Sequence, residues 1–440
     1  MAYGVWLFMV VVGWLLKPFR RRKSRVLRRC LLVTYCGANN TGAEARTKEA
    51  LRQIREIVGK RTVFEVIALN RENALRYFDE DERLRIVTPG YMFLFDIAKL
   101  VLASDMVVLV EGSGFRQNFS SALLWYFLYA LGLATILGRT TVAYAVDAGR
   151  LTGGNRFFAR RVARNVDLLM TRTAQAAEVL RKLGVKRPIY VHTDTAFSLA
   201  QPAHTKVAMS TQTIREMPLI GLAFKEFFWY PIDPNFVCFL KGEKAHRFSS
   251  FYYYSWNDEI ERKSQEFKQM AARLLTAAEE RYGARVVLIA MEHMDGVPCE
   301  DIAGMMKAPP RIWSCDQHDV AEMTALLRSL DVLITTRYHA FVLSTAAGVP
   351  TIAVSHDERL KSVMEEMSLD RDFYFEYDAW TPAELLPKLE LALERVMGDR
   401  KRISEQIRSR HAEYSVRSLM NQSRFATFLR EKHHDWMEQR

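Results

Sequence analysis

Short apolar stretches alternate with amphipathic stretches through most of the chain. Leu31–Tyr35 has the length and composition of a strand, and the apolar positions of Ala43–Val58 recur at helical spacing. Strands that alternate with helices are typical of an open, mostly parallel sheet covered by helices on both faces. In the first half of the chain, the same alternation predicts further strands at Val63–Leu69, Met106–Val110, Thr141–Val146, Leu168–Thr171 and Ile189–His192.

A second series of the same kind begins after Gln201–Pro218, a polar stretch that we interpret as a linker. Its predicted strands are Leu219–Phe224, Ala284–Ala290, Val332–Thr336 and Thr351–Ser355, and its predicted helices are Asp258–Tyr282, Asp319–Leu330 and His339–Ala347. The remainder, Ala383–Arg440, is helical and rich in charge of both signs. The pattern predicts an α/β fold of two doubly wound Rossmann-like domains facing a cleft, at residues 30–208 and 209–382, with a helical tail at 383–440.

The amino terminus does not follow this alternation. Residues 1–16 are uncharged and almost all apolar, and eight basic residues follow between Lys17 and Arg29. A cleaved signal peptide has its positive charges ahead of the apolar run, which is the opposite order. Sixteen residues at ~1.5 Å each reach roughly 24 Å, slightly short of a ~30 Å hydrocarbon core, so a short spanning helix and a shallow interfacial helix both fit.

Both forms predict that residues 1–29 attach the protein to a membrane. Basic residues favour the cytoplasmic leaflet, where each one near anionic lipid contributes about 1 kcal/mol. We therefore expect the protein at the cytoplasmic face of the inner (plasma) membrane. A second uncharged run, Ser121–Gly138, is long enough to cross as well. We interpret it as a buried or membrane-facing helix of the first domain, because a crossing would remove it from the strand–helix alternation.

Composition narrows the class of protein. The chain has 440 residues, 49% of them hydrophobic and 26% charged, which leaves ample apolar surface for real cores and excludes a mostly disordered chain. The formal charge of +11 falls to +3 without the eight basic residues near the amino terminus, so we predict no nucleic-acid partner. Five cysteines without a CxxC pair indicate a reducing compartment, and we predict neither a metal site nor a cofactor.

Three segments follow predicted strands, where ligands bind in open α/β sheets. In the first, Asn40 offers hydrogen bonds and Glu44 falls in the first turn of the next helix. In the second, Glu111 and Gly112 begin a glycine-rich loop that allows close approach of a ligand. Plain strand-to-helix turns have the same composition, so a structural role stays open for both loops.

The third segment carries more chemistry. Arg337 directly follows the carboxyl end of a predicted strand, and His339 begins the next helix. Arginine supplies a fork of donors matched to carboxylate or phosphate, and histidine transfers protons near neutral pH. The structural alternative is that Arg337 pairs with a buried carboxylate and that His339 only caps the helix.

These motifs together resemble the polysaccharide pyruvyl transferase family. The Arg-Tyr-His-Ala sequence of Arg337–Ala340, followed by Gly348–Pro350, is similar to the strongest family motif. Asn40–Ala45 resembles the first family loop, although it lacks the Gly-Asp pair of many members. The strand that ends in Arg172 and the Asp-Thr-Ala-Phe sequence at Asp194 resemble two further elements, and the similarity extends over most of residues 31–369.

The resemblance implies a two-domain fold similar to B-type glycosyltransferases. It also implies transfer of the pyruvyl group of phosphoenolpyruvate to two hydroxyls of a sugar, which gives a cyclic ketal and free phosphate. The implied donor-binding residues are Arg172, Arg337 and His339. A family lysine falls on Arg359 in an ungapped count, or on Lys361 if the loop is two residues longer, so this contact stays open between the two.

The chemistry of the donor agrees with this set, because phosphate and carboxylate on one small skeleton need several converging cations. Our hypothesis is that His339 serves as acid or phosphate donor and that Glu44, Glu111 or Asp194 is the base. The expected partners are phosphoenolpyruvate and a lipid-linked glycan acceptor. The sequence does not indicate an oligomeric state. A B-type nucleotide-sugar glycosyltransferase and a non-catalytic scaffold of glycan assembly remain the alternatives.

Overall fold

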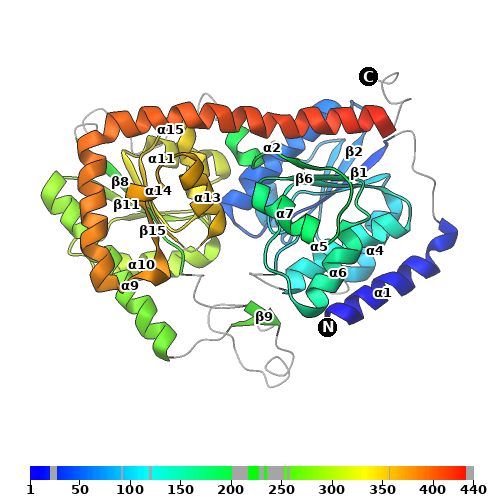
Figure 1. Cartoon of the computed structure of the whole chain (residues 1–440), viewed down its shortest axis with the longest axis horizontal. Helices are drawn as coiled ribbons and strands as arrows, with labels where there is room; N and C mark the ends of the chain where they lie inside the picture. Colours follow the sequence, from blue (N-terminus) through cyan, green and yellow to red (C-terminus); the bar gives the residue numbers. More distant parts are fainter. Residues whose placement is uncertain are drawn as a thin grey trace.

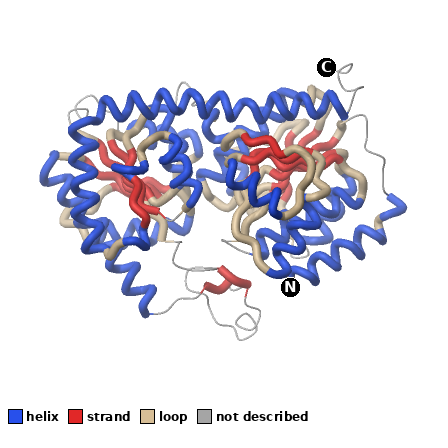
Figure 2. The backbone as a smooth tube through the Cα atoms, in the orientation of Figure 1, coloured by secondary structure: helices blue, strands red, loops and turns tan. Residues whose placement is uncertain are grey.

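The computed structural model shows two lobes, each built on its own parallel sheet (Figure 1). In both lobes helices surround the strands (Figure 2). The predicted fold class of two Rossmann-like α/β domains is confirmed, and the predicted domain limits stay predictions. The structure describes residues 1–19, 27–90, 93–117, 121–200, 217–226, 258–355 and 357–432, and the backbone of 232–234 and 252–254.

The first sheet has seven strands in the order β3-β2-β1-β4-β5-β6-β7. The chain fills one side of β1 with β2 and β3 and then returns to place β4 on its other side, so the order reverses between β1 and β4. Every residue of β4, β5 and β6 is buried, as expected for parallel strands covered on both faces. The strands are β1 (Arg29–Val33), β2 (Val63–Ile67), β3 (Leu84–Val87), β4 (Met106–Leu109), β5 (Thr140–Val146), β6 (Leu168–Thr171) and β7 (Ile189–Val191).

Helices connect these strands. They are α2 (Thr41–Ile57), α3 (Arg71–Leu75), α4 (Phe93–Ala103), α5 (Ser121–Ile136), α6 (Gly153–Ala163) and α7 (Ala174–Lys182). The start of α2 is fixed by its sequence, because the backbone N–H groups of Gly42 and Ala43 donate to the side chain of Asn40, each at 3.1 Å.

The second sheet has six strands in the order β12-β11-β8-β13-β14-β15, with the reversal between β8 and β13. Its strands are β8 (Leu219–Ala223), β11 (Arg285–Ala290), β12 (Arg311–Ser314), β13 (Val332–Thr335), β14 (Thr351–Ser355) and β15 (Tyr374–Glu376). Its helices are α9 (Asp258–Tyr282), α10 (Gly296–Gly304), α11 (Val320–Ser329), α12 (Tyr338–Ser344), α13 (Glu358–Glu366) and α14 (Asp370–Phe373). A short antiparallel pair, β9 (Ile232–Pro234) and β10 (Tyr252–Tyr254), precedes α9.

The predicted tail forms α15 (Pro382–Lys432), which runs across both lobes and has non-helical backbone angles at Asp399 (Figure 1). On the second lobe, Arg400 forms an ion pair with Asp331 at 2.8 Å. On the first lobe, the Asn421 side chain donates to the carbonyl of Thr193 at 3.0 Å. This helix therefore joins the lobes instead of extending away from them. Residues 433–440 of the predicted tail, and 201–216 of the predicted linker, lie outside the described residues.

Both uncharged runs are helical. The buried-helix interpretation of the second run is confirmed, because α5 is buried along most of its length. The first run forms α1 (Ala2–Leu15), which packs against α5 and α6. Among the described residues, no helix combines the length and apolar content needed to cross a bilayer, which contradicts the spanning alternative for residues 1–16. The physical reason is that α1 ends after fourteen residues and its inner face packs on the protein.

Candidate active site

A pocket lies between the lobes at the carboxyl ends of the strands where each sheet reverses. Its cavity volume is about 120 Å³, which is small for a ligand site. The loops after β1 and β4 line it from the first lobe, and the loops after β8, β13 and β14 line it from the second. Both reversal points therefore open into one pocket, as the general rule for ligand binding in α/β sheets predicts.

The two lobes make direct backbone contacts beside this pocket. Asn40 forms an isolated antiparallel bridge with Glu292. The backbone N–H of Thr41 donates to the carbonyl of Met291 at 2.8 Å. These contacts place the first turn of α2 against the second lobe, so the predicted first loop shares one wall of the pocket with the Arg337 segment.

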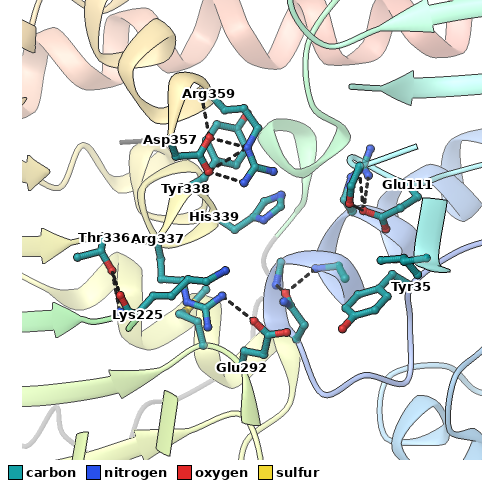
Figure 3. A pocket seen from close by; sticks show the side chains of 17 residues that line it. Tyr35, Glu111, Lys225, Glu292, Thr336, Arg337, Tyr338, His339, Asp357 and Arg359 are labelled. Carbon is teal, nitrogen blue, oxygen red and sulfur yellow. Dashed lines mark hydrogen bonds and ion pairs between the residues drawn. The ribbon is translucent and has the colours of Figure 1, made fainter. Parts of the chain in front are cut away.

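His339 lies in the pocket next to this first turn (Figure 3). Its Nε2 is 3.5 Å from Oδ2 of Asp194, which is fully buried. Burial lowers the pKa of His339 below its ordinary value, although the negative charge of Asp194 opposes this shift. The imidazole is therefore neutral at pH 7 and available to accept a proton.

Gly42 explains why the first loop contains glycine at this position. A Cβ on Gly42 would lie 2.2 Å from Nδ1 of His339, which is far inside contact distance. We predict that Gly42→Ala displaces the imidazole and lowers kcat/KM at least about 100-fold, because a 1 Å misplacement has an effect of that order. Gly398→Ala is the matched control, since no atom lies within 4 Å of a Cβ there. Equal activities for the two variants would show that the position of the ring is unimportant.

Arg337 also lines the pocket, and it is bound to two carboxylates. Its Nη1 is 2.8 Å from Oε2 of Glu292, and its Nη2 contacts Asp295. Burial would lower the pKa of Arg337, but the two carboxylates raise it. Burial raises the pKa of Asp295 to about 6. Arg337 thus pairs with buried carboxylates, as the structural alternative expected, and faces the pocket as well.

The structure separates Arg359 from Lys361. Arg359 lines the pocket, where its Nε is 2.7 Å from Oδ1 of Asp357 and its guanidinium lies 5.3 Å from the centre of the Tyr338 ring. Lys361 lies outside the pocket lining and pairs with Glu376 on the surface, with the ammonium 3.1 Å from the carboxylate. The ungapped count places the family lysine at Arg359, and this choice agrees with the position of Arg359 in the pocket lining.

Arg172 lies behind the pocket rather than in it. Its side chain is fully buried, with Nη1 2.5 Å from Asp194 and Nη2 3.1 Å from Asp147. Gly112 permits this arrangement, because a Cβ there would lie 2.8 Å from Nη1 of Arg172. Arg172 is not among the residues that line the pocket, so its implied contact with the donor stays a prediction. Arg172 instead holds Asp194, which in turn contacts His339.

The three carboxylates proposed as bases occupy different environments. Glu111 lines the pocket, accepts hydrogen bonds from the backbone and hydroxyl of Ser113, and lies 3.8 Å from Arg46. Glu44 is buried outside the pocket lining, where burial raises its pKa to about 8. Burial would also raise the pKa of Asp194, but Arg46 and His339 hold it well below its ordinary value. Of these three, Glu111 has direct access to a ligand.

The sequence analysis did not identify Lys225, which follows β8 and lines the pocket near Arg337 (Figure 3). Its backbone N–H donates to the hydroxyl of Thr336 at 2.7 Å. Burial, followed by the positive charge of Arg337, lowers the pKa of Lys225 to about 7. The sequence did contain a signal for this residue, because Lys225 directly follows the strand predicted at Leu219–Phe224. That strand is β8, and the strand order of the second sheet reverses between β8 and β13, where ligands are expected to bind. Arg46 and Glu292 were also missed.

Comparison with known proteins agrees with the motif analysis. A family model described as polysaccharide pyruvyl transferase matches residues 40–358. The matched region includes all the residues that line the pocket except Tyr35 and Arg359. A search of curated proteins gave no match.

Solved structures are similar over nearly the whole chain. HepE from Anabaena, in complex with UDP-glucose, is 11% identical, with a TM-score of 0.58 over 92% of this chain and 99% of that chain. A putative UDP-N-acetylglucosamine 2-epimerase from Listeria monocytogenes is 13% identical, with a TM-score of 0.55 over 87% and 91% of the two chains. At these identities the likeness shows the shared fold alone.

Proposed function

Since the chain belongs to the polysaccharide pyruvyl transferase family, we propose that it transfers the pyruvyl group of phosphoenolpyruvate to two hydroxyls of a glycan. The family implies a phosphoenolpyruvate donor and a polysaccharide acceptor. The observation that supports this reaction is the pocket in which Arg337 and His339 of the family-like motif meet the loop at Asn40. The products are a cyclic ketal and inorganic phosphate.

The reaction is balanced in protons and electrons without a redox partner. Each acceptor hydroxyl forms a C–O bond to C2 of the donor, and the bond between C2 and the phosphate oxygen breaks. One hydroxyl proton adds to C3 as the enol double bond is lost, and the other is transferred to the departing phosphate. The protein therefore needs a group that removes a hydroxyl proton, a group that protonates C3, and cations that stabilise the leaving phosphate.

The pocket offers one residue or pair for each task. Because its pKa is lowered, His339 is proposed to accept the hydroxyl proton, which reverses the acid role hypothesised from the sequence. Lys225 in its ammonium form is the candidate acid toward C3. Arg337 and Arg359 hold the carboxylate and phosphate, and each charge-assisted hydrogen bond contributes roughly 1.5–3 kcal/mol. Glu111 remains in reach of the second hydroxyl.

Lys225 makes donor binding depend on pH. A bound polyanion favours the ammonium form, whereas the pKa of about 7 means that the free protein loses this proton above neutrality. We predict that phosphoenolpyruvate binds with proton uptake and that Kd rises up to about tenfold per pH unit between pH 7.5 and 9. Calorimetric titration in buffers of different ionisation enthalpy measures the uptake. In Lys225→Met the profile should become flat over this range, and an unchanged slope in that variant would assign the proton to another group.

We further propose that the acceptor is lipid-linked and that the enzyme works at the cytoplasmic face of the inner (plasma) membrane. Support comes from the apolar residues 1–16 and the eight basic residues that follow between Lys17 and Arg29. Attachment to a membrane would hold the enzyme in the plane of such an acceptor.

Ligand binding and product analysis together test the reaction. Phosphoenolpyruvate should raise the melting temperature of the full chain, and nucleotide-sugars, which a B-type glycosyltransferase would bind, should not. Incubation with phosphoenolpyruvate and lipid-linked glycans should release phosphate and add the mass of one pyruvyl ketal to one glycan. Stabilisation by nucleotide-sugars alone, or phosphate release without a pyruvylated product, would overturn the proposal.

A further inference from the structure

Helix α1 has no polar side. Residues 2–15 are uncharged, and a helix that is apolar all round is normally covered all round. Its inner face is covered by the first lobe: Met9 and Val12 are buried, and a Cβ on Gly13 would lie 2.7 Å from Ile136 of α5. The inner face therefore fixes the helix along the protein.

The outer face of α1 is open, and α4 extends it. Phe8 of α1 packs edge-on against Phe95 of α4, with the ring centres 5.4 Å apart. Large apolar side chains on these two helices are exposed, with Trp14 at 68% and Phe95 at 45%. We call this surface the α1–α4 face; it consists of Tyr3, Leu7, Val10, Val11, Trp14, Leu15, Phe93 and Phe95. Contiguous apolar patches of this kind mark interaction sites in soluble domains.

Basic residues follow α1 in the sequence, and one lies near the α6 side of the α1–α4 face. The eight basic residues between Lys17 and Arg29 follow α1 directly in the sequence, and no acidic residue precedes Glu44. On the α6 side, Arg161 lies over the ring of Phe157, with its guanidinium 5.0 Å from the ring centre. Phe157 in turn packs against the ring of Tyr3 on α1. An apolar strip bordered by basic residues is complementary to anionic headgroups above acyl chains.

We propose that the α1–α4 face inserts into one anionic leaflet with α1 lying in the plane of the membrane. Fourteen residues span only ~21 Å as a helix, and crossing would require the inner face to leave α5. In-plane insertion instead covers the exposed side chains while the packed side stays in place. The inference gives a surface and an orientation to the membrane location proposed above, and it rests on this surface rather than on pyruvyl transfer.

Vesicle binding of the full chain tests the surface. Co-sedimentation is measured with vesicles of phosphatidylcholine containing about one third phosphatidylglycerol, and with phosphatidylcholine alone. We expect binding to the anionic vesicles that Leu7→Gln/Trp14→Gln weakens at least about tenfold, because each side chain contributes apolar burial. Val416→Gln is the matched control, since Val416 is 62% exposed on α15, outside the α1–α4 face. Phe93→Ser/Phe95→Ser should weaken binding as well.

The remaining outcomes separate this proposal from its rivals. Release of bound protein by alkaline carbonate supports in-plane insertion, whereas retention would indicate a spanning helix and overturn it. Unchanged binding of Leu7→Gln/Trp14→Gln would also overturn it, as would a wild-type dimer that these substitutions dissociate. Pyruvyl transfer to a short water-soluble acceptor should be unaffected by the same substitutions. Absence of transfer in the wild type would contradict the proposed function and leave the vesicle result intact.

Discussion

Replacement of His339 by alanine should lower kcat about 10²–10⁴-fold and leave the fold intact. Its imidazole is a neutral proton acceptor at the pocket, with Nε2 3.5 Å from Asp194. General acid–base groups contribute rate factors of that size. The neighbouring Arg172 keeps its ion pairs with Asp194 and Asp147 in the variant, so no buried charge loses its partner. Phosphate release at saturating phosphoenolpyruvate measures the effect.

The matched variant is His339→Gln, which keeps a hydrogen-bonding side chain but cannot take up a proton. We expect it to bind phosphoenolpyruvate with near wild-type affinity and to turn over as slowly as His339→Ala. Added imidazole should partly restore His339→Ala, because the lost ring bordered the open pocket. Turnover of either variant within a few-fold of the wild type would exclude His339 as the proton acceptor.

The sequence predicted the central parts of the fold well. Buried strands such as β6 and β14 are continuous apolar runs, so their predicted and observed limits coincide. The edge strands β3 and β12 were missed, because each includes an exposed arginine, Arg85 or Arg311. These residues interrupt the apolar run from which a strand is recognised.

The motif residues were predicted more reliably than their partners. Arg337 and His339 line the pocket as expected, since their position after a strand fixes where they lie. The carboxylates that hold Arg337 come from the loop after β11, which no local pattern connects with the motif. The glycines were ambiguous for a related reason. Gly42 and Gly112 make room for His339 and Arg172, which are distant in sequence.

Removal of Arg337 should affect both stability and catalysis, and the two effects can be separated. Arg337→Met leaves Glu292 and Asp295 buried without their cation, and the loss of one partner from a buried ion pair costs about 3–5 kcal/mol. We expect the free energy of unfolding to fall by about that amount and kcat/KM to fall at least about 100-fold. Arg337→Lys retains the charge without the two-pronged geometry, so it should recover stability more than activity.

Neutralising the carboxylates distinguishes the two roles. If the stability loss comes from uncompensated charge, adding Glu292→Gln/Asp295→Asn to the Arg337→Met variant should restore most of the lost stability. In a mutant cycle, the effects of the two sets of substitutions on the free energy of unfolding would then not add. Activity should not return, because the cation facing the pocket is still absent. Recovery of both properties would show that Arg337 only neutralises its two neighbours and does not hold the donor. If the triple variant regains stability but stays inactive, the positive charge of Arg337 is needed for the reaction itself. In that variant no buried carboxylate is left without a partner, so lost stability cannot explain the lost activity.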